Sequence, residues 1–335
     1  MRGGRGIVAA AAAQAYPGAP VPAGRYTVDS ASSRRADFVL DATFGTTSTT
    51  RAGVRMARLS VVLIVRDEAA QLRACLETAS WADEIVVLDG GSRDDTVAIA
   101  RTFTDHVHVN ADWQGFGVQR QRAQSMASGD WILMLDADER ITPELRGAIA
   151  QVVRDDDRNI AGAVARLPVC FGRIIRHGGW YADRVVRLYP RERAGYDDTR
   201  VHEGARLPAG MRVANLPGDL VHYTYRDLEH YLTKSASYAA IWADDRARRG
   251  RKAGLADAVG HALAKFLKMY VLRGGFRDGR IGLLLAVLAS HSVFVKYADL
   301  WLRWLPVPAD GGPSRQADAA PSRHPPQAGD AGAGR

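Results

Sequence analysis

Two aspartates stand one residue apart at the end of a strongly apolar run. The run WILMLD covers residues 131–136, and Asp136 is followed by Ala137 and Asp138. Two carboxylates at this spacing can hold a hard divalent cation, and such a cation can bridge the two phosphates of a diphosphate. A lone D-x-D triplet is also common as a solvated acidic turn. Its meaning therefore depends on where the fold places it.

A third carboxylate closes another apolar run. Asp89 ends EIVVLD (84–89) and leads into GGSRDDT. A carboxylate at a strand end, followed by glycines that let the backbone approach a ligand, suits recognition of a ribose or a base. Asp94 or Asp95 could instead cap a helix that opens at Thr96, and we expect capping for at least one of them.

Alternating strand and helix signals surround these carboxylates. LSVVLIV (59–65) is rich in β-branched residues, as expected for a strand buried on both faces of a parallel sheet. Four strands separated by helices imply right-handed βαβ crossovers and a nucleotide-binding half of Rossmann type. Ligands bind such a sheet outside the carboxyl ends of its strands, where Asp89 and Asp136 would emerge. The expected strands are 59–65, 84–89, 106–110 and 131–136, and the expected helices are 68–80, from about 96, and 118–128.

Beyond Pro143 the pattern becomes α+β. We expect a helix near 144–154, then the strand-like stretches AGAVARLPV and VVRLYP, with the aromatic and glycine-rich loop HGGWYADR between them. From Leu228 onward helices dominate. After about Pro306 the composition returns to Pro, Ala, Gly and Asp, which indicates a disordered tail.

Composition limits the possible classes. The chain has 335 residues, 47% of them hydrophobic, so it can bury a sizeable core. Cys75 and Cys170 lack the spacing of a zinc or redox motif and are interpreted as buried thiols. The net charge of +8 suits an anionic membrane surface, a phosphorylated substrate or nucleic acid. Since no RRM, helix-turn-helix or zinc-finger pattern accompanies it, we expect no nucleic-acid partner.

A series of motifs resembles family 2 glycosyltransferases of the α/β GT-A fold. They are SVVLIVRDEA, VVLDGGSRDDT, WQGFGVQRQRA, WILMLDADER, GGWYADRVVRLY and RVHEG, within residues 59–300. Within the family the chain is most similar to the WaaE-like branch, whose members add glucose to the inner core of lipopolysaccharide. The resemblance implies a UDP-glucose donor, Mg²⁺ or Mn²⁺, and inversion at the anomeric carbon. It implies that Asp89 contacts the uridine, that Asp136 and Asp138 engage the diphosphate and metal, and that the donor site comprises Val65, Asp67, Glu68, Asp89, Ser92, Asp94, Arg120, Asp136, Ala137 and Asp138.

An inverting transfer needs a general base for the acceptor hydroxyl. The acidic residue that matches the family pattern is Glu203, in Val201-His202-Glu203. A carboxylate suits this role because it is ionised at neutral pH. The alternative is a surface ion pair of Glu203 with Arg200 or Arg206. His222 is a candidate further metal ligand by the same resemblance, although a structural histidine is the commoner case.

The loop before VVRLY supplies candidate acceptor residues. Trp180, Tyr181, Asp183 and Arg184 combine aromatic rings that stack on sugars with groups that bind hydroxyls, and we expect Arg184 or Arg187 near phosphate. A tryptophan in a loop is about as often a packing anchor.

The carboxyl-terminal third indicates membrane contact. A basic cluster at 246–252 precedes LADAVGHALAKFLKMYVLRGGF, and a basic helix beside apolar residues is typical of an interfacial anchor. The apolar run 281–295 is shorter than the roughly 20 residues that a spanning helix needs. We expect peripheral attachment to the inner face of the cytoplasmic membrane, with a lipid-linked glycan as acceptor.

The expected organisation has four parts. They are an N-terminal extension (1–57), expected to be disordered with translation starting at Met56, a GT-A catalytic domain (58–226), a helical membrane-associated region (227–305) and the tail (306–335). Two alternatives remain open: a transferase that acts on a polyprenyl phosphate, and an inactive GT-A module that serves as a membrane scaffold.

Overall fold

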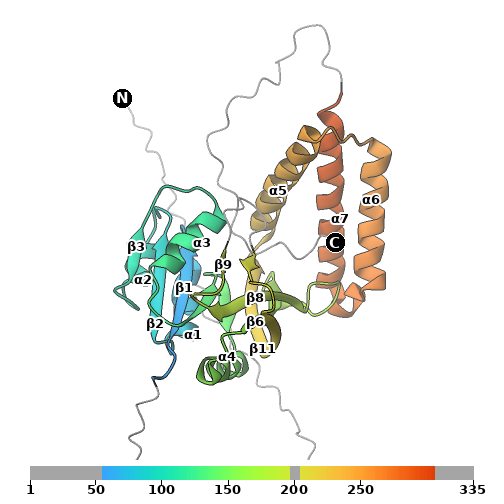
Figure 1. Cartoon of the computed structure of the whole chain (residues 1–335). Helices are drawn as coiled ribbons and strands as arrows, with labels where there is room; N and C mark the ends of the chain where they lie inside the picture. Colours follow the sequence, from blue (N-terminus) through green and yellow to red (C-terminus); the bar gives the residue numbers. More distant parts are fainter. Residues whose placement is uncertain (1–54, 197–203, 306–335) are drawn as a thin grey trace, which may run out of the picture. The chain divides into compact units, whose positions relative to one another are not determined.

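Four parallel strands form the first half of the sheet. The computed structural model describes residues 55–196 and 204–305, and within them the strand order begins β3-β2-β1-β4, all parallel (Figure 1). The alternation expected from the sequence is confirmed. These strands and their helices are β1 (Leu59–Val65), α1 (Ala69–Ala79), β2 (Glu84–Asp89), α2 (Thr96–Ala100), β3 (Val107–Val109), α3 (Phe116–Ser125) and β4 (Trp131–Leu135).

The sheet continues with strands of mixed direction. β8 (Asp183–Pro190) is antiparallel to both β4 and β6 (Ile160–Cys170), and β11 (Arg212–Tyr225) is parallel to β6. β5 (Glu139–Ile141) closes the far edge against β11, with His222 opposite Glu139. The smaller elements are α4 (Pro143–Asp155), β7 (Arg173–Ile174), β9 (Gly195–Tyr196) and β10 (Ala205–Arg206).

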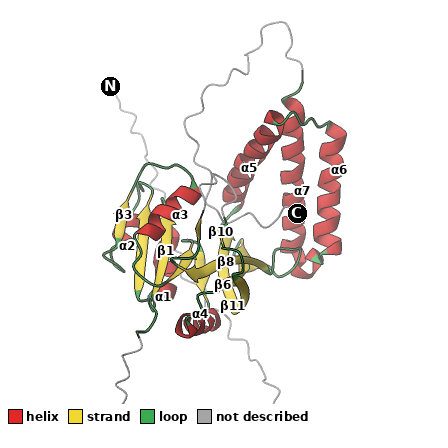
Figure 2. Ribbon diagram, viewed as in Figure 1, coloured by secondary structure: helices red, strands yellow, loops and turns green. Residues whose placement is uncertain are grey.

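Both faces of the sheet are buried at β1, β2 and β4, which explains these uninterrupted apolar strands. On one face, β1 and β4 pack against Leu72 and Leu76 of α1 and Leu145 of α4. On the other face, Phe116 and Ala123 of α3 pack against the sheet (Figure 2). The α/β class expected from the sequence is confirmed, and the carboxyl ends of β1, β2 and β4 lie at one edge.

Three long helices follow the sheet. They are α5 (Leu228–Arg248), α6 (Leu255–Leu267) and α7 (Gly279–Leu302), with a π-helical turn (Lys268–Leu272) and a 3-10 turn (Gly275–Asp278) between α6 and α7. A third hydrophobic cluster joins them to the sheet domain. Cys170 of β6 and Tyr225 of β11 share it with Tyr231 of α5 and Leu285 of α7.

The segment through α7 is longer than the apolar run suggested. Within the described residues, Gly275–Leu302 is the one helical segment long and apolar enough to cross a membrane, judged by length and composition alone. The length of this segment therefore no longer argues against a transmembrane helix. Peripheral attachment remains a prediction. The expected domain boundaries also remain predictions, and the segments 1–54, 197–203 and 306–335 lie outside the described residues.

Candidate active site

Asp136 is enclosed by two arginines. Its two carboxylate oxygens accept hydrogen bonds from Arg120 of α3 at 2.7 Å and from Arg187 of β8 at 2.5 Å. Arg187 also donates to the buried Glu139 at 2.7 Å. Burial would raise the pKa of Asp136, but the two guanidinium groups outweigh it and hold that pKa below its ordinary value. Asp136 is thus a fixed anion whose lone pairs are already directed at arginine.

Asp138 has a different environment. Its Oδ2 lies 3.3 Å from Nε2 of His222, which β11 brings alongside β5. Its Oδ1 is buried without a hydrogen-bond partner, and Nε2 of His222 also lacks a hydrogen bond. Burial opposes the charged form of both groups, yet their attraction lowers the pKa of Asp138 and raises that of His222. An unsatisfied carboxylate oxygen beside an imidazole nitrogen is a donor set that suits a divalent cation.

Glu68 completes an acidic group around this pair. Burial raises the pKa of Glu68 to about 8, and the charges of Asp138, Asp136 and Asp94 add to the shift. The structure therefore brings these four acidic side chains, all predicted from the sequence, within electrostatic range of one another. Arg120, Arg187, His222 and Lys234 offset part of their repulsion, and a bound cation would offset more of it.

The turn after β2 is built around Asp89. Oδ1 of Asp89 accepts from the backbone N–H groups of Gly91 and Ser92, both at 2.8 Å, and Ser92 Oγ donates to Oδ2. Ser92 in turn accepts from the backbone of Asp67 at 2.8 Å, and Asp67 accepts from the backbone of Arg93 at 2.7 Å. These bonds tie the ends of β1 and β2 together. In this structure Asp89 therefore stabilises the turn, whereas the sequence predicted that it contacts the uridine.

Three other predicted donor-site residues lie near the same edge. Asp94 accepts from the backbone N–H groups of Thr96 and Ala69, the first residues of α2 and α1, whereas Asp95, the N-cap residue of α2, makes no side-chain capping bond. The carbonyl of Val65 accepts from Gly90 at 2.8 Å. Ala137 is buried between the two aspartates, and its carbonyl accepts from Arg140 at 2.8 Å.

Sequence reasoning missed two charged residues here, Glu139 and Lys234. Arg187, a candidate for contact with phosphate, instead donates to Asp136 and Glu139. Lys234, on α5, is 96% buried, lies 5.8 Å from the ring centre of Tyr225 and lowers the pKa of both Glu68 and Asp138. A lysine on an amphipathic helix carries no sequence signal that distinguishes it from a solvated one.

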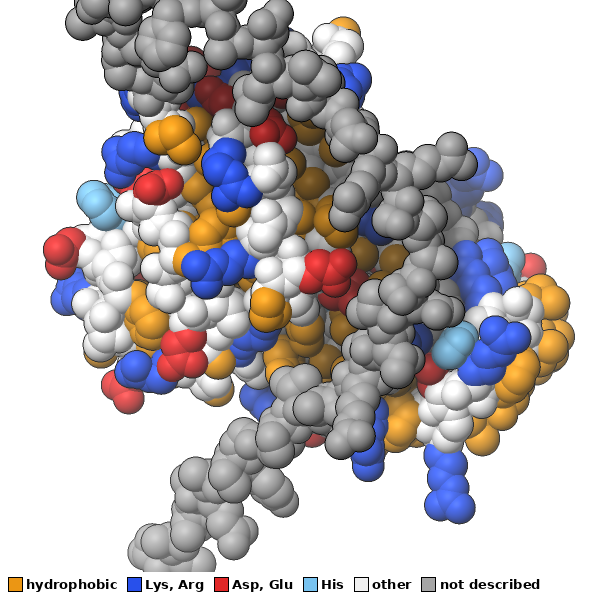
Figure 3. Space-filling model, turned by 90° about the horizontal axis from the view of Figure 1, so that it is seen from below, with side chains coloured by type: hydrophobic (Ala, Val, Ile, Leu, Met, Phe, Trp, Pro, Cys, Tyr) orange, Lys and Arg blue, Asp and Glu red, His pale blue; other side chains and the backbone are white. Residues whose placement is uncertain are grey.

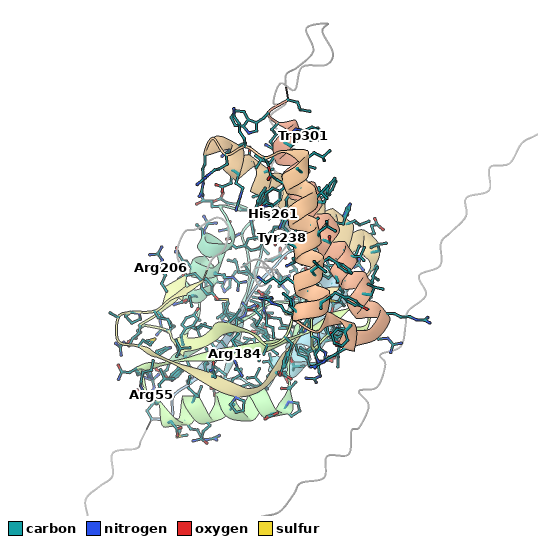
Figure 4. The ribbon with its side chains drawn as sticks, turned by 90° about the vertical axis from the view of Figure 1, so that its right-hand side faces the viewer. Arg55, Arg184, Arg206, Tyr238, His261 and Trp301 are labelled. Atoms are coloured by element: carbon teal, nitrogen blue, oxygen red, sulfur yellow. The ribbon has the colours of Figure 1, made fainter. Side chains whose placement is uncertain are left out.

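The four acceptor candidates do not meet at one point. Trp180 packs into the third hydrophobic cluster, with its ring 6.1 Å from that of Tyr225. The hydroxyl of Tyr181 donates to Asp219 at 2.9 Å, and Asp183 is ion-paired with Arg166. Arg184, labelled in Figure 4, lies exposed on β8 and donates to the carbonyl of Leu216 at 3.4 Å. The packing alternative for Trp180 fits these contacts.

Glu203 lies outside the described residues, so the structure says nothing of its position. Across residues 55–196 and 204–305, no three His, Cys, Asp or Glu side chains gather closely enough to hold a metal ion by themselves. Asp138 and His222 fit two places in a metal site. Asp136 does not fit a third in this arrangement, because both of its oxygens accept from arginine.

Comparison with known proteins decides the family. Residues 60–214 match the model described as "Glycosyl transferase family 2". The chain is 28% identical to the lipopolysaccharide core biosynthesis glycosyltransferase LpsC of Rhizobium meliloti, over 73% of this chain and 92% of that protein. Residues 60–214 thus form a family 2 glycosyltransferase domain.

Two further similarities are found. The glycosyltransferase is 27% identical to an uncharacterized glycosyltransferase of Rickettsia prowazekii over 73% of its own length and 87% of that protein. Among solved structures, glucosyl-3-phosphoglycerate synthase from Mycobacterium tuberculosis, in complex with Mg²⁺ and UDP, is 24% identical with a TM-score of 0.29. That alignment spans 33% of this chain and less than half, 44%, of the other. The GT-A-like fold expected from the sequence is confirmed, and the chain falls in the LpsC-like branch.

Proposed function

We propose that this glycosyltransferase moves glucose from UDP-glucose to a membrane-linked acceptor in the lipopolysaccharide inner core, with inversion of the anomeric carbon. The similarity to LpsC, whose name refers to lipopolysaccharide core biosynthesis, supports the acceptor class. The arrangement of acidic groups at the carboxyl edge of the sheet supports a nucleotide diphosphate donor.

The observation that carries the proposal is the buried pair of Asp138 and His222. One oxygen of Asp138 and one nitrogen of His222 are buried without hydrogen bonds, although unsatisfied buried polar atoms are costly. These two groups would hold Mg²⁺ or Mn²⁺, with phosphate oxygens of the donor as further ligands. Bound there, the ion would neutralise negative charge that accumulates on the departing diphosphate.

The remaining charges have separate roles in this proposal. Arg120 and Arg187 keep Asp136 ionised and fixed, so that it orients the donor without itself binding the ion. The ordered turn at Asp89 receives the uridine, and the hydrogen bonds of Ser92 and Asp67 fix the conformation of its backbone. Lys234 offers a positive charge on the side of the site formed by α5.

Glu203 is proposed as the general base. It would accept the proton of the acceptor hydroxyl while that oxygen attacks the sugar from the face opposite the diphosphate. Trp180, Tyr181, Asp183 and Arg184 remain the proposed acceptor side of the site, with Trp180 acting through packing. The enzyme would work at the inner face of the cytoplasmic membrane, where a lipid-linked acceptor is presented.

A ligand panel tests the proposal directly. The melting temperature of the protein is measured with UDP-glucose, UDP-galactose, GDP-mannose and UDP, each with and without Mn²⁺, since a ligand that binds the native state raises it. UDP-glucose with Mn²⁺ should give the largest rise. A larger rise with GDP-mannose, or rises that are equal with and without Mn²⁺, would contradict the donor or the metal respectively.

A further inference from the structure

The turn between α6 and α7 exposes large apolar side chains. In the segment 267–284, here called the α6–α7 tip, Leu272 is 79% exposed and Phe276 is 52% exposed. Four others in the tip are also exposed: Leu267, Val271, Leu283 and Leu284. Figure 3 shows hydrophobic side chains gathered with basic ones at the edge of the molecule where α6 lies. Exposed apolar groups in this density mark an interaction surface.

The charges of the tip identify the partner. Lys268, Arg273, Arg277 and Arg280 are all exposed, and Asp278 is the only acidic residue of the segment. Large apolar side chains among cations are typical of a surface that enters the interface of an anionic bilayer. A second copy of the chain fits poorly, because pairing two tips would bring eight cations together.

The tip differs from the basic cluster that the sequence emphasised. At 246–252 the cations have acidic and aromatic neighbours: Arg248 pairs with Asp244 at 2.6 Å, and Arg249 pairs with Asp245 at 2.9 Å. That cluster lies at the other end of α6, toward the end of α7 that carries Trp301 (Figure 4). The tip therefore has fewer acidic neighbours, and it carries Leu272, at 79% the most exposed large hydrophobic residue in the described part of the chain.

The tip is bound to the loop that contains the acceptor candidates. Asp278 accepts from the backbone of His177 at 2.8 Å and lies 2.8 Å from its ring Nδ1. Gly178 donates to the carbonyl of Arg273 at 2.9 Å. At Gly179, a Cβ atom would fall 2.3 Å from the Arg273 side chain, so the loop and tip are in direct contact there.

We propose that the α6–α7 tip inserts into the interfacial region of an anionic lipid bilayer and holds the loop 176–180 at the membrane surface. The placement of this loop at the membrane has a role only if the acceptor is lipid-linked, as proposed above. The insertion of the tip does not depend on that proposal. The tip enters with Leu272 and Phe276, its cations face the lipid headgroups, and the contacts of Asp278 and Arg273 keep the acceptor side of the site beside the bilayer.

Vesicle flotation of the full chain tests the proposal. The parent should float with phosphatidylethanolamine vesicles that contain phosphatidylglycerol, and much less with phosphatidylcholine vesicles. The double variant Leu272→Glu/Phe276→Glu should reduce the bound fraction at least about tenfold, because it removes the two apolar side chains that would enter the bilayer and adds two negative charges.

A matched control separates the loss of the apolar tip from the effect of two added negative charges. Val109 and Val213 are 57% and 51% exposed on the sheet domain, so Val109→Glu/Val213→Glu adds the same charge at comparable exposure and should float like the parent. Equal flotation of the tip variant and the parent would overturn the proposal. The proposal would also be overturned if the tip variant floated like the parent but sedimented as a monomer where the parent sediments as a dimer. The tip would then be a subunit interface.

A separate readout keeps this result independent of the proposed function. The rise in melting temperature with UDP and Mn²⁺ should be the same in the parent and the tip variant, because the tip carries no proposed donor ligand. Loss of flotation with this rise intact supports the tip as the membrane surface. Absence of the rise in the parent itself would count against the proposed donor chemistry and leave the flotation result standing.

Discussion

The Asp138 carboxylate lies 3.3 Å from Nε2 of His222, although 83 residues separate the two along the chain by their numbering. The contact exists because β5 and β11 pair with His222 opposite Glu139, the residue that follows Asp138. Sheet pairing thus assembles the proposed metal site.

Removal of either partner should weaken cation binding. Asp138→Ala and His222→Ala should each reduce the affinity for Mn²⁺ at least about tenfold, measured by calorimetry in the presence of UDP, because each removes one proposed ligand. Asp105→Ala, an exposed aspartate far along the sequence from the pair, serves as the control. Unchanged Mn²⁺ affinity in Asp138→Ala would remove the main support for the proposed chemistry.

The buried arginine network should matter for stability. Arg187→Met leaves Asp136 and Glu139 buried without their shared donor, so it should lower the free energy of unfolding by about 3–5 kcal/mol. Urea denaturation of Arg187→Met and of Arg249→Met gives the comparison, since the exposed Arg249 pair should contribute less than about 1 kcal/mol. Similar losses in both variants would show that the buried network has no special role.

Glu68 predicts a pH dependence. Its pKa is raised from 4.5 to about 8, so the native state retains a proton that the unfolded chain has already released over this interval. Its contribution to stability is therefore present in full below pH 4.5 and is lost as pH rises toward 8. Glu68→Gln, measured against the parent by thermal unfolding with a chelator present, should become relatively more stable across this range. Parallel curves for the two proteins would disprove the shift.

Lys234 should act on the diphosphate part of the donor. If its charge faces the phosphates, Lys234→Met weakens UDP binding by about tenfold or more, while uridine binding changes little. Lys234→Arg should retain most of the UDP affinity. Arg248→Met, which removes an exposed cation from the same helix, should bind UDP like the parent. An equal loss for uridine and UDP in Lys234→Met would indicate a general structural defect.

The first half of the fold follows from local pattern, whereas the second half depends on tertiary pairing. β1, β2 and β4 are fully buried apolar runs, and their parallel order was predictable because helices separate them. β11 was not predicted. Pro217 and Gly218 interrupt it, and Gly218 adopts φ +85° where a Cβ would lie 2.3 Å from the backbone N of Leu145. The strand forms because β6 and β5 pair with it on both sides.

The site shows the same division. The carboxylates at Asp89, Asp136 and Asp138 could be found because each follows a predicted strand. Their contacts could not be predicted, although His222 was already a candidate ligand, since Arg187, His222 and Lys234 come from β8, β11 and α5. Only the completed sheet and the helix packed beside it bring them near. The disagreement over Asp136 has the same origin, because its two arginines were invisible as neighbours before the fold was known.

The third hydrophobic cluster, shared by Tyr225, Trp180 and Leu285, has a practical meaning for work on this enzyme. Truncating the chain before α5 would leave aromatic rings of the sheet domain facing water and would remove Lys234, so a shortened version would aggregate more readily. A soluble, active preparation is better sought by substituting the outward-facing leucines of α6 and α7 one at a time.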